Sequence, residues 1–231
     1  RIQHYISRKA LDIEGLGGET VALLVNAGLI KDIADLYTLN IDDVLPLERM
    51  AQKSAENLIY GIEASKQIPF ERVLFGLGIR YVGETVAKTL AKHFKSVGAL
   101  SQARIEDLEA VDEIGIKIAE SVYHFFRNEN NIRLVSRLVS YGVQLELSKE
   151  ALANQTTLLS GERIVVSGVF EAISRNELKA LIEANGGKVV SSISAKTTYL
   201  VAGTNMGPSK RQKAEQLKIP ILTEQEFLEK F

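Results

Sequence analysis

The residues best suited to chemistry are glycines that stand just before helical segments at a regular spacing. Gly17, Gly83 and Gly115 hold the same place in a motif that occurs four times, and Ala51 holds it in the second copy. Apolar residues stand four before, one before and seven after each place: Ile13, Leu47, Ile79, Val111; Leu16, Met50, Val82, Ile114; Leu24, Leu58, Leu90, Val122. A turn of this kind leaves backbone N–H groups free at a helix start, where the helix dipole adds positive charge. The pattern therefore predicts repeated anion sites that a phosphate can approach closely.

The copies differ in how much of the motif they keep. Residues 15–17 carry both glycines, whereas residues 81–83 carry only the second. Residues 113–115 place a glutamate before the turn, which would repel a phosphate, and residues 49–51 lack both glycines. In that second copy, Arg49 and Lys53 could supply charge instead. We expect the strongest anion binding at copies one and three, and mainly packing roles for copies two and four.

Candidate nucleic-acid contacts are the turn glycines and the cations or hydroxyls beside them: Gly15, Gly17, Gly18, Lys53, Arg80, Gly83, Thr85, Gly115 and Lys117. Turns that bind successive phosphates read no base, so binding would be independent of sequence. Two alternatives stay open at this point. Each single Lys or Arg could be a solvated helix face, and the whole array could be a helical repeat that only packs.

The elements that would position these turns are helices from residue 11 to about residue 142. Each repeat predicts a helix, a tight turn and a second helix, with short helical connectors at residues 33–37 and 105–108. Residues 1–10 also have helical spacing. Further glycines are predicted at turns or helix ends, where a positive φ is tolerated: Gly28, Gly61, Gly76, Gly78 and Gly98. This part should be all-α.

The pattern changes after residues 143–160, which we interpret as containing a linker. Short β-branched runs predict strands at residues 163–167, 188–190, 198–202 and 219–222. Ser174 with Glu177, and Thr223 with Glu226, form predicted capping boxes before helices, and Ser209 is the predicted N-cap of a third helix. Strands that alternate with helices predict a parallel four-stranded sheet covered on both faces.

The hairpins are typical of the helix-hairpin-helix motif, and residues 160–231 resemble a BRCT domain. The resemblance rests on residues 166–168, on the Gly186-Gly187 pair and on residues 196–203. In phosphate-binding members of that family, the positions that match Ser167, Gly168 and Lys210 form a small pocket, and a hydroxyl, an amide and an ammonium suit a phosphate. The usual Trp of the last helix and a second tandem copy are both missing here. A purely structural role for Gly168 therefore remains the alternative.

The order of these modules resembles the C-terminal half of bacterial NAD-dependent DNA ligase. It implies a multidomain fold: residues 1–145 as a helix-hairpin-helix array, 146–159 as a linker and 160–231 as a small α/β BRCT domain. It also implies a fragment that holds nicked double-stranded DNA during replication and repair, next to the rest of the ligase chain upstream. The family uses NAD, Mg²⁺ and structural Zn²⁺. This chain has no Cys and no Lys-x-Asp-Gly string, so we expect no catalytic residue, metal site or cofactor, and no activity of the fragment alone.

Composition fits this hypothesis. Residues 1–155 carry 18 Lys and Arg against 21 Asp and Glu, and residues 156–231 carry 10 against 8, which gives −3 and +2. DNA contacts must then use local donors rather than bulk positive charge. No apolar run is long enough for a membrane span. The first residue is Arg, so we expect a piece of a longer protein that starts beyond the zinc finger, monomeric, cytoplasmic and associated with the nucleoid.

Two other functions remain open from the sequence. In the first, the BRCT pocket binds a phosphorylated protein and the helices serve as a scaffold, so the protein is a non-enzymatic adaptor. In the second, the chain is the DNA-binding tail of a repair nuclease.

Overall fold

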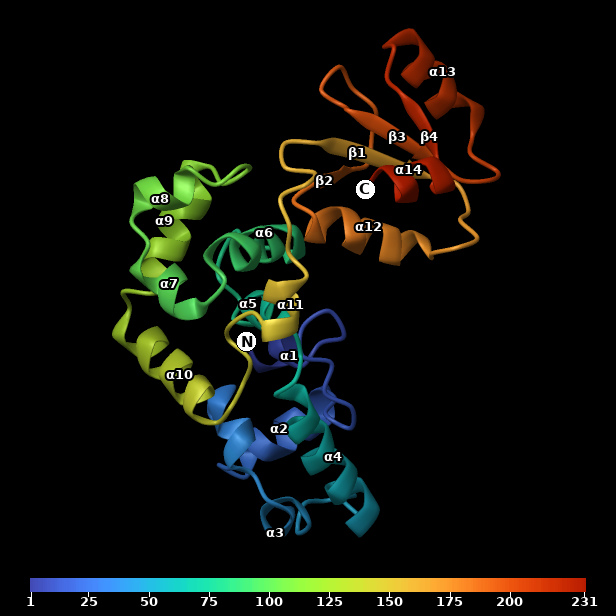
Figure 1. Cartoon of the computed structure of the whole chain (residues 1–231). Coiled ribbons are helices and arrows are strands. Elements are labelled where there is room, and N and C mark those ends of the chain that lie inside the picture. Colours follow the sequence, from blue (N-terminus) through green and yellow to red (C-terminus); the bar gives the residue numbers. More distant parts are fainter. The chain divides into compact units, whose positions relative to one another are not determined.

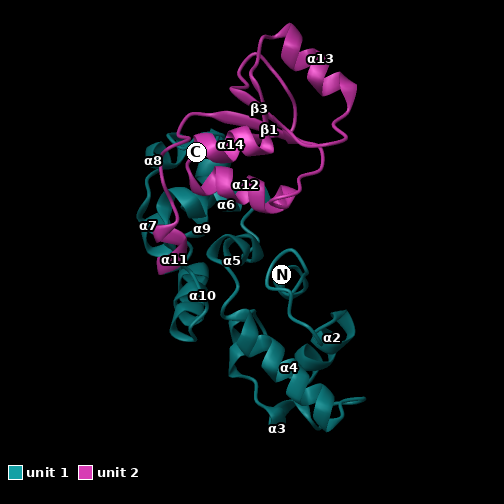
Figure 2. Ribbon diagram, turned by 45° about the vertical axis from the view of Figure 1, so that its right-hand side comes forward, with its two compact units in different colours: residues 1–148 teal, residues 149–231 magenta.

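The computed structural model describes all 231 residues and divides them into two compact units, residues 1–148 and residues 149–231 (Figures 1 and 2). The first unit contains helices and no strand, and the second contains a four-stranded sheet with helices. The predicted fold class, an all-α hairpin array followed by a small α/β domain, is confirmed. None of the helices has the length and apolar character needed to span a bilayer.

The first unit consists of short helices joined by tight turns. Its elements are α1 (Ile2–Tyr5), α2 (Gly18–Asn26), the 3₁₀ helix η1 (Ala34–Thr38), α3 (Ile41–Val44), α4 (Gln52–Ser65), α5 (Phe70–Gly76), α6 (Glu84–Phe94), α7 (Val97–Gln102), α8 (Ile105–Glu109), α9 (Ile116–Phe125) and α10 (Glu129–Ser140). The two predicted connectors are confirmed as η1 and α8. The predicted hairpins end in α2, α4, α6 and α9.

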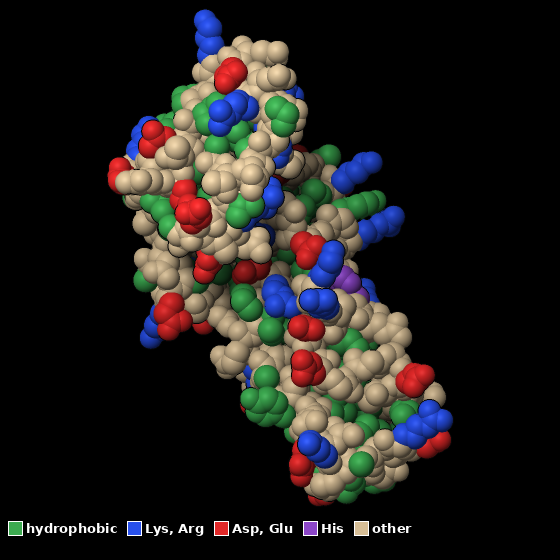
Figure 3. Space-filling view, turned by 90° about the vertical axis from the view of Figure 1, so that its right-hand side faces the viewer, with side chains coloured by type: hydrophobic (Ala, Val, Ile, Leu, Met, Phe, Trp, Pro, Cys, Tyr) green, Lys and Arg blue, Asp and Glu red, His purple; other side chains and the backbone are tan.

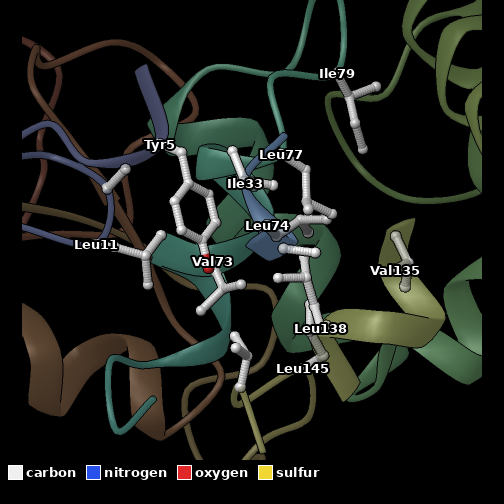
Figure 4. Close-up of a cluster of buried hydrophobic side chains, with 14 of the residues drawn as sticks. Tyr5, Leu11, Ile33, Val73, Leu74, Leu77, Ile79, Val135, Leu138 and Leu145 are labelled. Atoms are coloured by element: carbon white, nitrogen blue, oxygen red, sulfur yellow. The ribbon is translucent and has the colours of Figure 1, made fainter. Parts of the chain in front are cut away.

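A single apolar core holds this unit together. Figure 4 shows Tyr5, Leu11 and Val73 side by side, with Leu74 and Leu138 in the same cluster. These residues come from α1, the segment after it, α5 and α10, so segments far apart in the sequence meet in one core. Burial of such side chains is the main stabilising contribution, about 1.5–3 kcal/mol for each large apolar group.

One polar chain passes through the core. The Tyr5 hydroxyl lies 2.7 Å from that of Tyr37, which lies 2.9 Å from Ser65 Oγ. Ser65 Oγ donates to the Ile62 carbonyl at 2.6 Å, so every hydroxyl has a partner. Burial, together with the nearby Tyr37, raises the pKa of Tyr5, and the phenol stays neutral.

Gly61 was expected at a turn or helix end, and this expectation is wrong. It lies inside α4, where a glycine costs about 0.5–1 kcal/mol relative to alanine. A Cβ at this position would lie only 3.0 Å from the Glu14 carbonyl oxygen. Glycine is therefore needed because α4 passes close to the backbone of the first hairpin.

The second unit contains α11 (Lys149–Ala153), β1 (Arg163–Ser167), α12 (Arg175–Ala184), β2 (Lys188–Val190), β3 (Tyr199–Ala202), α13 (Pro208–Gln216), β4 (Ile221–Thr223) and α14 (Glu224–Lys230). The strand order is β2-β1-β3-β4, and all pairs are parallel. Ile164 and Val166 pack with residues of α12 and α14, whereas Val165 packs with Ala214 of α13. Both faces of the sheet are covered, as predicted.

The helix starts of this unit were predicted with one error. The capping boxes of Ser174 with Glu177 and of Thr223 with Glu226 are both formed. Helix α13, however, begins at Pro208 with Gly207 as its N-cap, so Ser209 does not cap it. Proline is favoured at the first helical position because it needs no N–H partner there. The predicted linker, residues 146–159, contains helix α11.

Candidate nucleic-acid interface

The four hairpin turns share one backbone conformation. Two residues before each helix N-cap, the backbone adopts the left-handed region, with φ of 78° at Gly15, 61° at Arg49, 67° at Tyr81 and 69° at Glu113. Non-glycine residues adopt this region at a cost of about 1–2 kcal/mol. The turn is therefore imposed by the fold around it, and loss of glycine in copies two to four leaves its geometry unchanged.

The residues that impose the turn are the apolar positions of the repeat. The residue four after each cap is fully buried or nearly so: Val21, Ala55, Ala87 and Ala119. The same holds seven after the cap, for Leu24, Leu58, Leu90 and Val122. Because the side chains at these two positions are buried, one face of each helix packs on the core, and the turn before the helix stays at the surface. The predicted register of the repeat is confirmed.

The four helices begin without a side-chain cap. Their N-cap residues are Gly17, Ala51, Gly83 and Gly115, and no side chain of these residues accepts a hydrogen bond from the first helical turn. Helix α10 differs, since Asn128 accepts from two of its first amides, and α12 has the Ser174 box. Exposed first-turn amides need water or a ligand. A phosphate suits them because it meets both the N–H groups and the helix dipole.

The space in front of the caps is open. A Cβ placed on Gly17, Gly83 or Gly115 would meet no atom within 4 Å, and Ala51 carries a Cβ at the equivalent place. Glycine is thus not required there by packing or by φ. Its remaining effect is access, because a bare Cα lets a phosphate come closer to the amides.

The copies associate in two pairs. A Cβ on Gly15 would lie 3.7 Å from Leu58 Cα, so the first turn touches α4 of copy two. Ser121 Oγ of α9 donates to the Arg80 carbonyl at 2.6 Å, which joins copy four to the turn of copy three. Each pair therefore presents two turns on one packed body.

All the candidate DNA contacts are exposed, but their charges differ between copies. The second residue of α4 is Lys53 and that of α9 is Lys117, whereas that of α2 is Glu19. Helix α6 begins with Glu84, whose carboxylate is paired with Lys9 at 3.2 Å. First-turn charge therefore favours an anion at copies two and four. This preference is opposite to the one that the glycines predict.

Charge elsewhere on the surface is mixed. On the face shown in Figure 3, Lys and Arg side chains, several of them close together near the middle of the view, are mixed with scattered Asp and Glu side chains. This agrees with the net charge of −1. A net charge near zero gives no bulk attraction for a phosphate, so the turn amides and the cations beside them are the donors of interest.

The candidate pocket of the second unit lies where β1 and β3 end. Ser167 is the buried last residue of β1, and Gly168 follows with a φ of 102°. A Cβ on Gly168 would lie 2.8 Å from Gly203, and Val169 exchanges two 2.8 Å backbone hydrogen bonds with Thr204. Close packing of the two loops thus accounts for Gly168. Lys210 is half-buried in the first turn of α13.

No metal site is formed. The chain brings no three His, Cys, Asp or Glu side chains together in a way that could hold an ion, and it contains no Cys. The residues present therefore do not fit the zinc site that the resembled family implies.

Family models match both units. The model "SAM-like Helix-hairpin-helix tandem" matches residues 7–64, the model "Helix-hairpin-helix motif" matches residues 72–135, and the "BRCA1 C Terminus (BRCT) domain" model matches residues 154–230. The first two ranges coincide with the two pairs of hairpins described above.

Curated relatives are similar to this chain over almost its whole length. A DNA ligase of Christiangramia forsetii is 68% identical over 99% of this chain, and one of Flavobacterium johnsoniae is 63% identical over 100%. A DNA ligase of Cytophaga hutchinsonii is 52% identical over 99%. In each case the chain spans 34% of the relative's own length. The chain thus combines helix-hairpin-helix and BRCT domains and belongs to the family of bacterial DNA ligases. It corresponds to about one third of the length of such a ligase.

Proposed function

We propose that this chain holds duplex DNA by its sugar–phosphate backbone, through the turns that begin α2, α4, α6 and α9. The observation that carries the proposal is the shared geometry of four helix starts, all exposed and none with a side-chain cap. Amides at a helix start bind phosphate without reading a base. Lys53, Arg80 and Lys117 supply charge beside three of these turns.

We place this DNA grip within an NAD-dependent ligase that seals nicks in the bacterial cytoplasm, at the nucleoid. The identity of the relatives as DNA ligases and the order of the domains support this placement. The chain contributes positioning of the duplex, as a monomer, and the joining chemistry belongs to other parts of the longer protein. The fragment alone is expected to seal no nick.

Binding to a nicked duplex at increasing salt concentration tests the proposal. Each phosphate that a cation neutralises contributes a slope of about −0.9 in log K against log salt. With Lys53, Arg80 and Lys117 as the principal cations, we expect a slope of about −3 and little difference between DNA sequences. Fluorescence anisotropy with two unrelated sequences would measure both quantities. No binding at about 50 mM salt, or a slope near zero, would contradict the DNA grip.

A further inference from the structure

Tyr81 occupies an unusual place in the third hairpin. It sits at the left-handed position, with a φ of 67°, where copy one has Gly15. The neighbouring apolar residue, Val82, is buried, but 52% of Tyr81 is exposed. Its ring therefore adds little to the core. Arg49 and Glu113 adopt the same conformation in their own copies, so the feature particular to copy three is an exposed aromatic ring at this place.

A cation is fixed beside the exposed ring. The Arg80 guanidinium carbon lies 5.0 Å from the centroid of the Tyr81 ring, within the range of a cation–π interaction. The backbone under this pair is held, because the Arg80 carbonyl accepts the hydrogen bond from Ser121. The turn thus presents an apolar ring and a positive charge together at the surface.

We propose that Tyr81 and Arg80 form a second DNA contact beside the amides of α6: the ring packs against a deoxyribose and the guanidinium pairs with the neighbouring phosphate. This inference rests on the proposed function. In a DNA strand a sugar separates each phosphate from the next, so a site next to a bound phosphate must accept an apolar face and then a negative charge. Tyr81 and Arg80 supply these two chemistries two and three residues before the cap at Gly83.

Replacement of the tyrosine by glycine separates a DNA contact from a structural role. Glycine relaxes the left-handed backbone, so Tyr81→Gly should melt no lower than wild type. If the ring contacts DNA, the same variant should bind a nicked duplex about tenfold more weakly, within the range measured for aromatic contacts to nucleic acid. Tyr81→Phe keeps the ring and should retain wild-type affinity.

Two further variants complete the test, in the full 231-residue chain. Tyr60 is also exposed, at 76%, but it lies in the middle of α4, so Tyr60→Ala should leave DNA affinity unchanged. Arg80→Gln should reduce the salt slope by about 1.

The outcomes distinguish this contact from the proposed function. If wild type binds DNA with the expected salt slope and Tyr81→Gly binds equally well, the tyrosine contact is refuted and the DNA grip stands. An equal loss in Tyr60→Ala refutes it as well, because position in the turn would then not matter. If wild type binds no DNA, both proposals are refuted.

Discussion

At the residue scale, the glycine that caps three of the four hairpin helices contributes access to the amides, and its conformational freedom is not used. Gly83 has φ −85° and ψ −174°, which any residue adopts, and a Cβ there would meet nothing within 4 Å. Gly15 is different, because its φ of 78° favours glycine. A substitution at Gly83 can therefore test the anion site while the fold is kept.

Gly83→Asp should have opposite effects on folding and on DNA binding. Aspartate is a better N-cap than glycine, so the free energy of unfolding should rise by a few tenths of a kcal/mol. Its carboxylate would occupy the amides and repel a phosphate, so affinity for nicked duplex should fall about tenfold or more. Thermal melting and anisotropy measure the two effects.

Gly207→Asp is the matched control for this substitution. Gly207 is also an N-cap with open space around it, but it begins α13 in the second unit. The control should gain similar stability and keep its DNA affinity. If Gly83→Asp binds DNA as tightly as wild type, the amides of α6 are not an anion site.

A second residue-scale prediction concerns the ion pair of Arg137 with Asp35. Arg137 donates to Asp35 Oδ1 at 2.7 Å and to Asp32 Oδ2 at 3.1 Å, which ties α10 to η1. Burial alone would raise the pKa of Asp35, but hydrogen bonds from the Arg137 guanidinium and two nearby amides outweigh it and hold that pKa below its usual value. Because the folded pKa is depressed, this stabilisation is complete above the unfolded pKa of about 3.9 and is lost as the pH falls through the folded value.

Asp35→Asn should therefore destabilise the protein at neutral pH by about 1–2 kcal/mol, because Arg137 is more than a third exposed and water weakens the pair. The difference in melting temperature from wild type should shrink as the pH falls below about 4. Melting curves of both proteins between neutral pH and acid would measure it. A difference that stays constant over this range would show that the charge of Asp35 does not carry the effect.

At the element scale, the sequence predicted those helices whose apolar register repeats. Buried residues such as Leu24 and Leu90 recur at a fixed distance from the cap, so the hairpins could be found even where the glycines are lost. The β-branched run of Ile164, Val165 and Val166 likewise made β1 recognisable, and in the structure these side chains alternate between the two faces of the sheet. Local capping boxes succeeded because both partners lie within one turn.

Apart from the N-cap of α13, where Pro208 decides the helix start locally, the error came from a contact between elements, which a local pattern does not contain. Gly61 looks like a turn residue until α4 is seen to pass close to the Glu14 carbonyl. The candidate DNA contacts all lie at the surface, but the shared backbone conformation of the four turns was not predicted. The glycines predicted which copies bind an anion most strongly, although the buried positions around each turn determine the conformation of that turn. The exposed aromatic ring of Tyr81, with Arg80 beside it, was likewise not singled out from the sequence.

At the scale of the whole molecule, the two units have separate cores. The first has one large apolar cluster, and the second has two clusters, one on each face of its sheet. All four hairpin turns belong to residues 1–148. Domains of about 50–250 residues with their own hydrophobic core can fold alone, so each unit should be an independent folding unit.

Separate expression of residues 1–148 and 149–231 tests this division of labour. Both segments should show cooperative thermal unfolding, because each keeps its own buried core. Residues 1–148 should retain affinity for nicked duplex within about tenfold of the full chain, with a similar salt slope, since the slope counts the phosphates that its cations neutralise. Residues 149–231 should bind DNA much more weakly. If the second unit instead carries most of the affinity, the hairpin turns serve mainly as packing elements, and the DNA grip must be reassigned to the basic residues of α13.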